Sequence, residues 1–187
     1  MSFRLIVAMD DSGGIGKNGQ IPWRCSADLR HFSQLTRGNI VVMGRKTWES
    51  IGSKPLPCRI NCVLSSQDMK TPKITHPCSN SDCTKPKVAT QVVFSKNIDA
   101  LIEWLKQHNN NTKMVWIIGG TEIYRQFMER NLISELHISR FPGTFECDTF
   151  FPCALIDKKF KKHSDQHLCF LNNDDAKSVT YQIWDCL

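Results

Sequence analysis

Short apolar segments alternate with amphipathic segments along most of this chain, and this alternation constrains the fold more than any single motif. Apolar runs predict strands over 3–9, 40–43, 59–64, 92–94 and 115–118, and helices are predicted over 26–36, 45–51, 99–107 and 121–130. After residue 130 only strands are predicted, near 135–140, 167–171 and 178–184. The pattern predicts an α/β fold with a mostly parallel central β-sheet, an antiparallel C-terminal end and flanking helices.

The chain has 187 residues, the size of one compact domain with a hydrophobic core. Residues 67–90 are rich in Pro, Lys, Ser, Thr and Asn and show hardly any periodicity. Strand patterning resumes directly afterwards, and either half alone is too small for a core. We therefore expect a single domain, 1–187, with a long surface excursion at 67–90.

The formal net charge of +6 favours an anionic partner. Basic residues are scattered, apart from Lys158-Lys159 and Lys161-Lys162, so no nucleic-acid-binding stripe is predicted. A cofactor with several phosphates explains the sign equally well. The apolar runs are short for a membrane span, and the N-terminus does not resemble a signal peptide. We expect a cytoplasmic protein with no membrane partner.

Nine cysteines are present, an odd number without a secretory signal, which favours free thiols in a reducing compartment. Two small groups could be imagined as zinc ligands, one at His76, Cys78 and Cys83 and the other at His163, His167 and Cys169. A zinc site would have to join these distant groups with loose spacing. We therefore predict no metal site.

A glycine-rich segment, Gly14-Ile15-Gly16-Lys17-Asn18-Gly19, matches G-x-G-x-x-G literally and follows a strand. The dinucleotide-binding motif also requires that its last glycine open a helix, and here Pro22 follows three residues later. No acidic residue lies about twenty positions further on, as that motif would need. The segment instead predicts a mobile loop over an active site, where backbone approaches a ligand closely.

Asp28 lies in the first turn of the helix for which Ser26 is the candidate N-cap. An acid there can simply favour the helix N-terminus through the macrodipole. Leu29 and Phe32, however, place apolar side chains beside it, and a carboxyl among apolar groups is costly without a partner. A ligand with two N–H groups would supply that partner by bidentate hydrogen bonding. The residues leave both interpretations open.

Three strand ends carry groups that suit a phosphate. Met43-Gly44-Arg45-Lys46-Thr47 and Ile118-Gly119-Gly120-Thr121 each join an apolar strand to a helix start, with Thr121 expected as the second N-cap. Leu64-Ser65-Ser66 adds hydroxyls at a third strand end. Together these segments suggest a nucleotide lying across the carboxyl edge of a parallel sheet. Arg59, at the start of a strand, is either an edge cation or a clamp for a carboxylate.

These segments, in this order, resemble the dihydrofolate reductase family over nearly the whole chain. The resemblance rests on Ile6-Val7-Ala8, Gly14-Ile15-Gly16, Ile21-Pro22-Trp23, Ala27-Asp28-Leu29, Val42–Trp48, Arg59, Leu64-Ser65-Ser66, Ile118-Gly119-Gly120 with Tyr124, and Phe145–Pro152. It implies NADPH-dependent reduction of 7,8-dihydrofolate to 5,6,7,8-tetrahydrofolate, which supports one-carbon metabolism and thymidylate synthesis. It also implies a cytoplasmic monomer without an obligate protein partner and a target of antifolates.

The resemblance assigns roles residue by residue. Asp28 would bind the pterin and promote protonation at N5, Trp23 would position a water, and Ser139 would hydrogen-bond to Asp28 where the family usually has Thr. The substrate site would comprise Ile6, Val7, Ala8, Asp28, Leu29, Phe32, Ile51, Leu56, Arg59, Ile118, Tyr124 and Ser139. The NADPH site would comprise Ala8, Ile15, Gly16, Gly19, Gly44, Arg45, Lys46, Thr47, Leu64, Ser65, Ser66, Lys96, Ile118, Gly119, Gly120, Thr121, Ile123 and Tyr124. Arg45 and Ser66 would contact the 2′-phosphate.

Two further positions depart from the family pattern. Cys58 stands where the family often has glycine, directly before the carboxylate-binding Arg59. Glu122 stands near the expected cofactor phosphates and would weaken NADPH binding unless Lys46 or Lys96 compensates. Two alternatives stay open. One is a catalytically silent relative that binds a ligand or nucleic acid, with steep salt dependence in the latter case. The other is a reductase of another pterin or flavin precursor.

Overall fold

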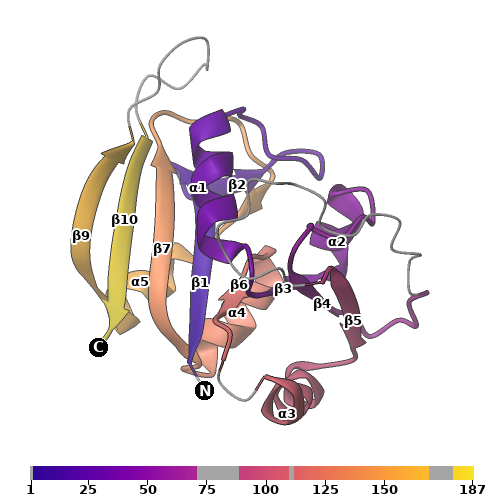
Figure 1. Ribbon diagram of the computed structural model, residues 1–187. Coiled ribbons are helices and arrows are strands. Elements are labelled where there is room, and N and C mark those ends of the chain that lie inside the picture. The colour runs from indigo at the N-terminus through magenta and orange to yellow at the C-terminus, as the bar shows by residue number, and fades with distance from the viewer. Residues whose placement is uncertain (1, 71–88, 110–111, 169–178) are drawn as a thin grey trace.

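A single eight-stranded sheet forms the centre of the computed structural model, which describes residues 2–70, 89–109, 112–168 and 179–187. The strand order is β5-β4-β3-β6-β1-β7-β10-β9 (Figure 1). The strands are β1 (Phe3–Asp10), β3 (Ile40–Gly44), β4 (Ile60–Leu64), β5 (Gln91–Ser95), β6 (Val115–Ile117), β7 (Ile133–Phe141), β9 (Phe160–Leu168) and β10 (Val179–Cys186). A separate two-stranded sheet joins β2 (Gly14–Gly16) to β8 (Thr149–Phe150).

The pairing within the large sheet confirms the predicted fold class. β1 pairs in parallel with β6 and β7, and β3, β4, β5 and β6 continue the parallel part. β10 runs antiparallel to both β7 and β9 at the C-terminal end. β4 and β5 are direct parallel neighbours, so one sheet continues across the 67–90 segment. Residues 71–88 of that segment lie outside the described part of the chain.

Two apolar clusters cover the two faces of this sheet. The helices are α1 (Ser26–Thr36), α2 (Arg45–Ser50), α3 (Ile98–His108), α4 (Thr121–Glu129) and α5 (Ile156–Lys159), with a 3-10 turn at Cys153–Leu155. The α1-side cluster contains Trp48 of α2 and the partly buried Phe32 and Leu35 of α1. The α4-side cluster contains the buried residues of α3 and α4 together with Ile156 of α5. Figure 1 shows α1 in front of the sheet, beside β1 and β7.

Several local predictions differ from the structure. The N-cap of α1 is Cys25, whose sulfur accepts from Asp28 N, rather than Ser26. β9 begins at Phe160 rather than near 167, because this edge strand is rich in charged residues and has a weak apolar pattern. The short elements β8 and α5 were not predicted, since two to four residues carry too little periodicity.

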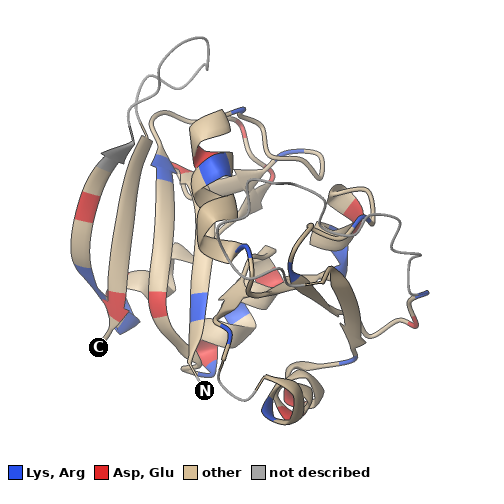
Figure 2. Ribbon diagram, viewed as in Figure 1, with Lys and Arg blue, Asp and Glu red and all other residues tan. Residues whose placement is uncertain are grey.

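Charged side chains are distributed over the whole molecule. Figure 2 shows basic and acidic positions interspersed on helices and strands, which agrees with the scattered basic residues of the sequence. Within the described ranges, no helix is both long enough and apolar enough to cross a membrane.

Candidate active site

Asp28 and Ser139 meet where helix α1 crosses strand β7. Ser139 is buried near the carboxyl end of β7 and pairs with Ala8 of β1. Its side chain is hydrogen-bonded to the carboxyl of Asp28 on the first turn of α1. The structure therefore brings together the two residues that the sequence analysis assigned to one hydrogen bond.

The environment of Asp28 makes it an unusual carboxyl. Burial raises the pKa of Asp28, while the hydrogen bond with Ser139 and the charge of His31 lower it, and the raising effect is the larger. Position in the first helical turn would by itself favour the charged form. A carboxyl with a raised pKa can hold a proton closer to neutral pH, as acid–base chemistry requires.

Trp23 is fixed at the same end of β7 by aromatic packing. Its ring stacks on Phe141 with centroids 4.6 Å apart and meets Phe145 edge-on at 5.1 Å. Ala8 and Ala27 pack against the same buried group. The indole is thus held rigidly near the strand that carries Ser139 and next to the helix that carries Asp28.

The apolar residues predicted to surround a substrate divide between the two faces of the sheet. Five of them share the α1-side cluster, namely Ile6, Phe32, Ile51, Leu56 and Ile118. Successive strand residues point to opposite faces, so Val7, which follows Ile6 in β1, packs into the α4-side cluster. A substrate on the α1 side of the sheet would therefore meet the backbone of Val7 and not its side chain. Leu29 is 59% exposed, so it extends from α1 instead of packing into the core.

Tyr124 is also more deeply placed than its predicted role suggests. It is buried in the α4-side cluster, and its hydroxyl donates to Ile6 O over 2.8 Å. Burial raises the pKa of this phenol strongly. An added Cβ at Gly119 would lie 3.1 Å from the same hydroxyl. Tyr124 thus supports the backbone of Ile6 and fits closely under Gly119.

Arg59 is a buried cation held against the inner side of α1. Its Nε donates to Thr36 Oγ1, one terminal nitrogen donates to Ser33 Oγ, and the other donates to Pro57 O, each over 3.0 Å. The guanidinium also lies 5.7 Å from the centre of the Phe32 ring. These contacts fix the orientation of a group suited to bidentate binding of a carboxylate. The sequence analysis did not assign a role to Ser33 and Thr36, although both follow Phe32 in the same predicted helix.

Cys58, next to Arg59, corrects the expectation of free thiols. It is disulfide-bonded, and its partner lies outside the described residues. Five others are free, namely Cys25, Cys62, Cys147, Cys153 and Cys186. The φ angle of Cys58 is 57°, in the left-handed region that explains why glycine suits this turn. The candidate zinc ligands Cys78, Cys83 and Cys169 fall outside the described part, within which no group of three His, Cys, Asp or Glu side chains could hold a metal.

Two helix N-termini meet where β3 and β6 end side by side. Gly44 and Gly120 are the N-caps of α2 and α4, and neither helix has a side-chain cap. Gly44 N donates to Gly119 O over 2.7 Å, and an added Cβ at Gly120 would lie 3.3 Å from Thr47 Oγ1. The predicted N-cap Thr121 is wrong, because its hydroxyl instead donates to Phe150 O. First-turn N–H groups without a side-chain cap, next to glycines, fit the phosphates of a dinucleotide.

The side chains expected at the 2′-phosphate lie at neighbouring strand ends. Arg45 forms an ion pair with Glu49 over 2.7 Å, and Ser66 is exposed directly after β4. Ser65 accepts from Gln67 N, while Lys96 pairs with Asp68 over 3.3 Å. Lys46 is exposed on α2. These contacts are local and on the surface, so the side chains can turn toward an anion at low cost.

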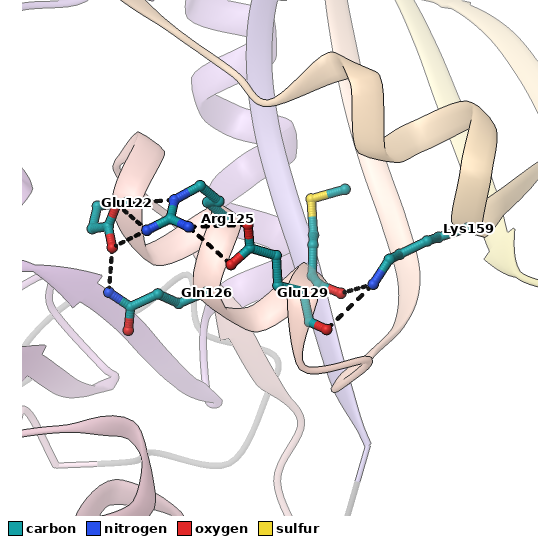
Figure 3. Close-up of polar contacts among 6 residues, drawn as sticks. Glu122, Arg125, Gln126, Glu129 and Lys159 are labelled. Atoms are coloured by element: carbon teal, nitrogen blue, oxygen red, sulfur yellow. Dashed lines mark hydrogen bonds and ion pairs between the residues drawn. The ribbon is translucent and has the colours of Figure 1, made fainter.

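Glu122 is balanced by its own helix rather than by Lys46 or Lys96. Arg125 binds Glu122 with two nitrogens and also reaches Glu129, and Gln126 donates to Glu122 over 2.6 Å (Figure 3). The hydrogen bonds from Arg125 and Gln126 hold the pKa of Glu122 below its usual range. Lys159 completes this region by donating to Met128 O and Glu129 O at the end of α4. The doubt about NADPH binding raised by Glu122 is thereby reduced.

The glycine-rich segment is tied to the β8 region. Gly14 and Gly16 pair with Phe150 and Thr149, and Ile15 packs against the α4-side cluster. An added Cβ at Gly19 would meet nothing within 4 Å. Asp10, which the sequence analysis did not assign, accepts from Ser12 N, Ser12 Oγ, Gly14 N and Phe145 N over 2.7–3.0 Å. Burial raises the pKa of Asp10, but these bonds together hold it below its ordinary value. The Asp-Asp-Ser-Gly run was a visible turn signal for this anchor.

Comparison with known proteins gives a consistent result. A family model described as dihydrofolate reductase matches residues 2–185. The chain is 34% identical over 189 residues to a dihydrofolate reductase of Bos taurus, covering 95% of this chain and 92% of that protein. It is 36% identical over 163 residues to one of Gallus gallus, covering 81% and 78%. A solved dihydrofolate reductase from Enterococcus faecalis, complexed with NADP(H) and RAB-propyl, matches with a TM-score of 0.72 and 26% identity over 99% of this chain and 96% of that one.

Proposed function

The chain belongs to the dihydrofolate reductase family, and from this premise we propose that the side chains around Asp28 carry the family's reaction. The protein reduces 7,8-dihydrofolate to 5,6,7,8-tetrahydrofolate with NADPH. The contact between Asp28 on α1 and Ser139 on β7 is the observation that carries our assignment of the site. It sets one carboxyl beside apolar side chains at the edge where the parallel strands end.

Asp28 has two tasks in this proposal. Its ionised form accepts hydrogen bonds from the amino group and N3–H of the pterin, which orients the ring. Its raised pKa keeps a protonated fraction available, so the carboxyl promotes the proton addition at N5, with a water positioned by Trp23. Ser139 keeps the carboxyl in one orientation. When bound, NADPH supplies the hydride that is added to C6 of the pterin.

The remaining residues bind the two molecules. Arg59, held by Ser33 and Thr36, is oriented to bind the α-carboxylate of the substrate's glutamate. The apolar wall consists of Ile6, Phe32, Ile51, Leu56 and Ile118, with Leu29 at its exposed rim. For Val7 and Tyr124 we propose backbone and supporting contacts only, because both side chains pack on the other face.

NADPH fits the two glycine-capped helix starts. We propose that the N–H groups after Gly44 and Gly120 receive its diphosphate and that Arg45 and Ser66 contact the 2′-phosphate. The glycine-rich segment would cover the nicotinamide with Ile15, Gly16 and Gly19. Gly119 would lie against the same ring, since glycine has no side chain of its own to separate them.

The setting of the enzyme is a further part of the proposal. Members of the family bind dihydrofolate and antifolate inhibitors, and we propose a monomeric single domain, 1–187, that works in the cytoplasm without a membrane or nucleic-acid partner. Five free thiols support a reducing compartment, whereas the disulfide at Cys58 weighs against it. Thiol titration of freshly purified protein under native and denaturing conditions shows whether Cys58 is oxidised or the cysteines are free thiols.

Loss of nicotinamide absorbance tests the function directly. Purified protein is mixed with NADPH and dihydrofolate, with NADH in a parallel series. Turnover that prefers NADPH supports the assignment. Folded protein that binds NADPH without turnover would instead favour another pterin or flavin precursor as substrate, or a silent relative. A nucleic-acid-binding role would appear as affinity that falls steeply with salt.

A further inference from the structure

His31 is a titratable side chain close to Asp28 to which the proposed reaction gives no role. It lies three residues after Asp28 on α1, and side chains at this spacing are neighbours on a helix surface. Its ring meets the ring of Tyr181 edge-on, with centroids 4.2 Å apart. Its Nε2 atom is buried and has no hydrogen-bond partner among the described residues. A buried polar atom without a partner is uncommon in folded proteins and calls for an explanation.

The sheet beneath α1 aligns His31 with Asp28. Ser139 of β7 and Tyr181 of β10 are directly opposite each other in the antiparallel ladder. Asp28 contacts Ser139, and His31 contacts Tyr181. Two helix residues one turn apart therefore lie on two adjoining residues of the sheet. This arrangement restricts the movement of His31 away from the carboxyl.

Further ionisable groups continue behind this pair. The hydroxyl of Tyr181 is hydrogen-bonded to His137 Nδ1, and His137 Nε2 lies 2.8 Å from Glu135 Oε1. Glu135 pairs in turn with Arg4 over 2.7 Å. The charged and titratable groups around His31 are thus Asp28 on α1, His137 and Glu135 on β7, Tyr181 on β10 and Arg4 on β1. Asp28 is the acid that acts directly on the charge of His31.

Burial moves the two groups toward a shared pH range. It lowers the pKa of His31, with the charge of Asp28 acting in the opposite direction. It raises the pKa of Asp28, with the charge of His31 acting in the opposite direction. Burial also lowers the pKa of His137, and a charge on His31 lowers it further, so a second proton on this cluster is disfavoured. The charge of each group therefore acts on the titration of the other.

We propose that His31 is a positioning residue for the reductase reaction, whose charge keeps Asp28 ionised so that the carboxylate can accept the two N–H groups of the pterin. The inference rests on the proposed function, because it acts through Asp28. It gives the unpartnered imidazole a task that an apolar ring at the same place could not perform. It also predicts that substrate binding weakens in mildly acidic solution, where His31 carries its charge, when that charge is removed.

A pH profile of the hydride-transfer rate tests this in wild type and in His31→Phe, which keeps a flat ring against Tyr181. The rate should fall as the pH rises and Asp28 loses its proton. Without the imidazole, Asp28 should keep its proton to higher pH, so the midpoint of this fall should move up by about half a pH unit or more. The KM for dihydrofolate should also rise in mildly acidic solution, where wild-type His31 is charged. His108→Phe is the matched control, because the His108 ring also packs against an aromatic ring, that of Trp104, but on α3. A midpoint within about 0.2 pH units of wild type would overturn the proposal.

A second measurement needs no turnover. NMR titration of the His31 ring in wild type and in Asp28→Asn reports the same coupling from the other side, since linkage between two sites is reciprocal. The titration of His31 should move to lower pH in Asp28→Asn. An unchanged His31 titration contradicts the proposal even if His31→Phe fails to fold. If the two groups are coupled but the protein does not turn over dihydrofolate, the interaction of His31 with Asp28 stands and the proposed reaction is wrong.

Discussion

Asp28→Asn is the most informative single change, because it removes the proton-carrying group and keeps its shape. An acid or base acting in the transition state contributes about 10²–10⁴-fold to the rate, or about 3–5.5 kcal/mol. The asparagine amide can still hydrogen-bond to Ser139 and still occupies the first turn of α1. We therefore expect turnover at neutral pH to fall by about two to four orders of magnitude, with NADPH affinity within about twofold of wild type.

The same substitution should leave the fold intact or make it more stable. The folded-state pKa of Asp28 is raised above its unfolded value by burial, so ionised Asp28 opposes folding at neutral pH. The stability contribution of this carboxyl is therefore greatest in acid and is lost as the pH rises through the folded pKa. Asparagine does not ionise, so the free energy of unfolding at neutral pH should equal or slightly exceed that of wild type.

The assay measures nicotinamide absorbance at saturating NADPH and dihydrofolate, with fluorescence titration of NADPH binding and urea unfolding on the same samples. Asp99→Asn is the matched control, since Asp99 lies in the first turn of α3 and is exposed. It should keep the wild-type rate. If Asp28→Asn retained more than about a tenth of the wild-type rate, Asp28 would not be the acid–base group of this enzyme.

Three further changes address the substrate clamp, the loop anchor and the cofactor site. Arg59→Ala should weaken dihydrofolate binding by about a hundredfold and NADPH binding by less than about threefold in calorimetry, whereas equal losses would argue against a carboxylate clamp. Asp10→Ala should lower the free energy of unfolding in urea by about 2–4 kcal/mol at neutral pH, because one buried and two part-buried N–H donors lose their acceptor. Because the folded-state pKa of Asp10 is lowered, this stabilisation is present above its unfolded pKa and disappears as the pH falls through the folded pKa, so the gap to wild type should close in acid. Glu122→Gln should change the Kd for NADPH by less than about threefold, since Arg125 already balances the charge, and a tenfold tightening would refute that balance.

The sequence determined the parts of this protein that depend on local order. Hydrophobic periodicity placed most strands and helices, and their alternation indicated a mostly parallel sheet with an antiparallel end. Turn chemistry marked the glycine-bearing strand ends that cap α2 and α4. The ordered motifs indicated the family and singled out Asp28 before any contact was known. Each of these signals lies within a few residues of chain, where backbone preference and side-chain period act directly.

Tertiary structure decided which distant side chains meet. Strand register sets Ser139 under Asp28 and Tyr181 under His31, and the pleat of β1 sends Val7 to the opposite face from Ile6. Glu122 pairs with Arg125, whereas the sequence analysis expected Lys46 or Lys96 to compensate its charge. This choice of partner depends on side-chain geometry that residue spacing does not give. A sequence lists such groups without their distances, and electrostatic and hydrogen-bond energies depend on distance and burial. The chemistry of this site therefore follows from the packing of α1 on the sheet.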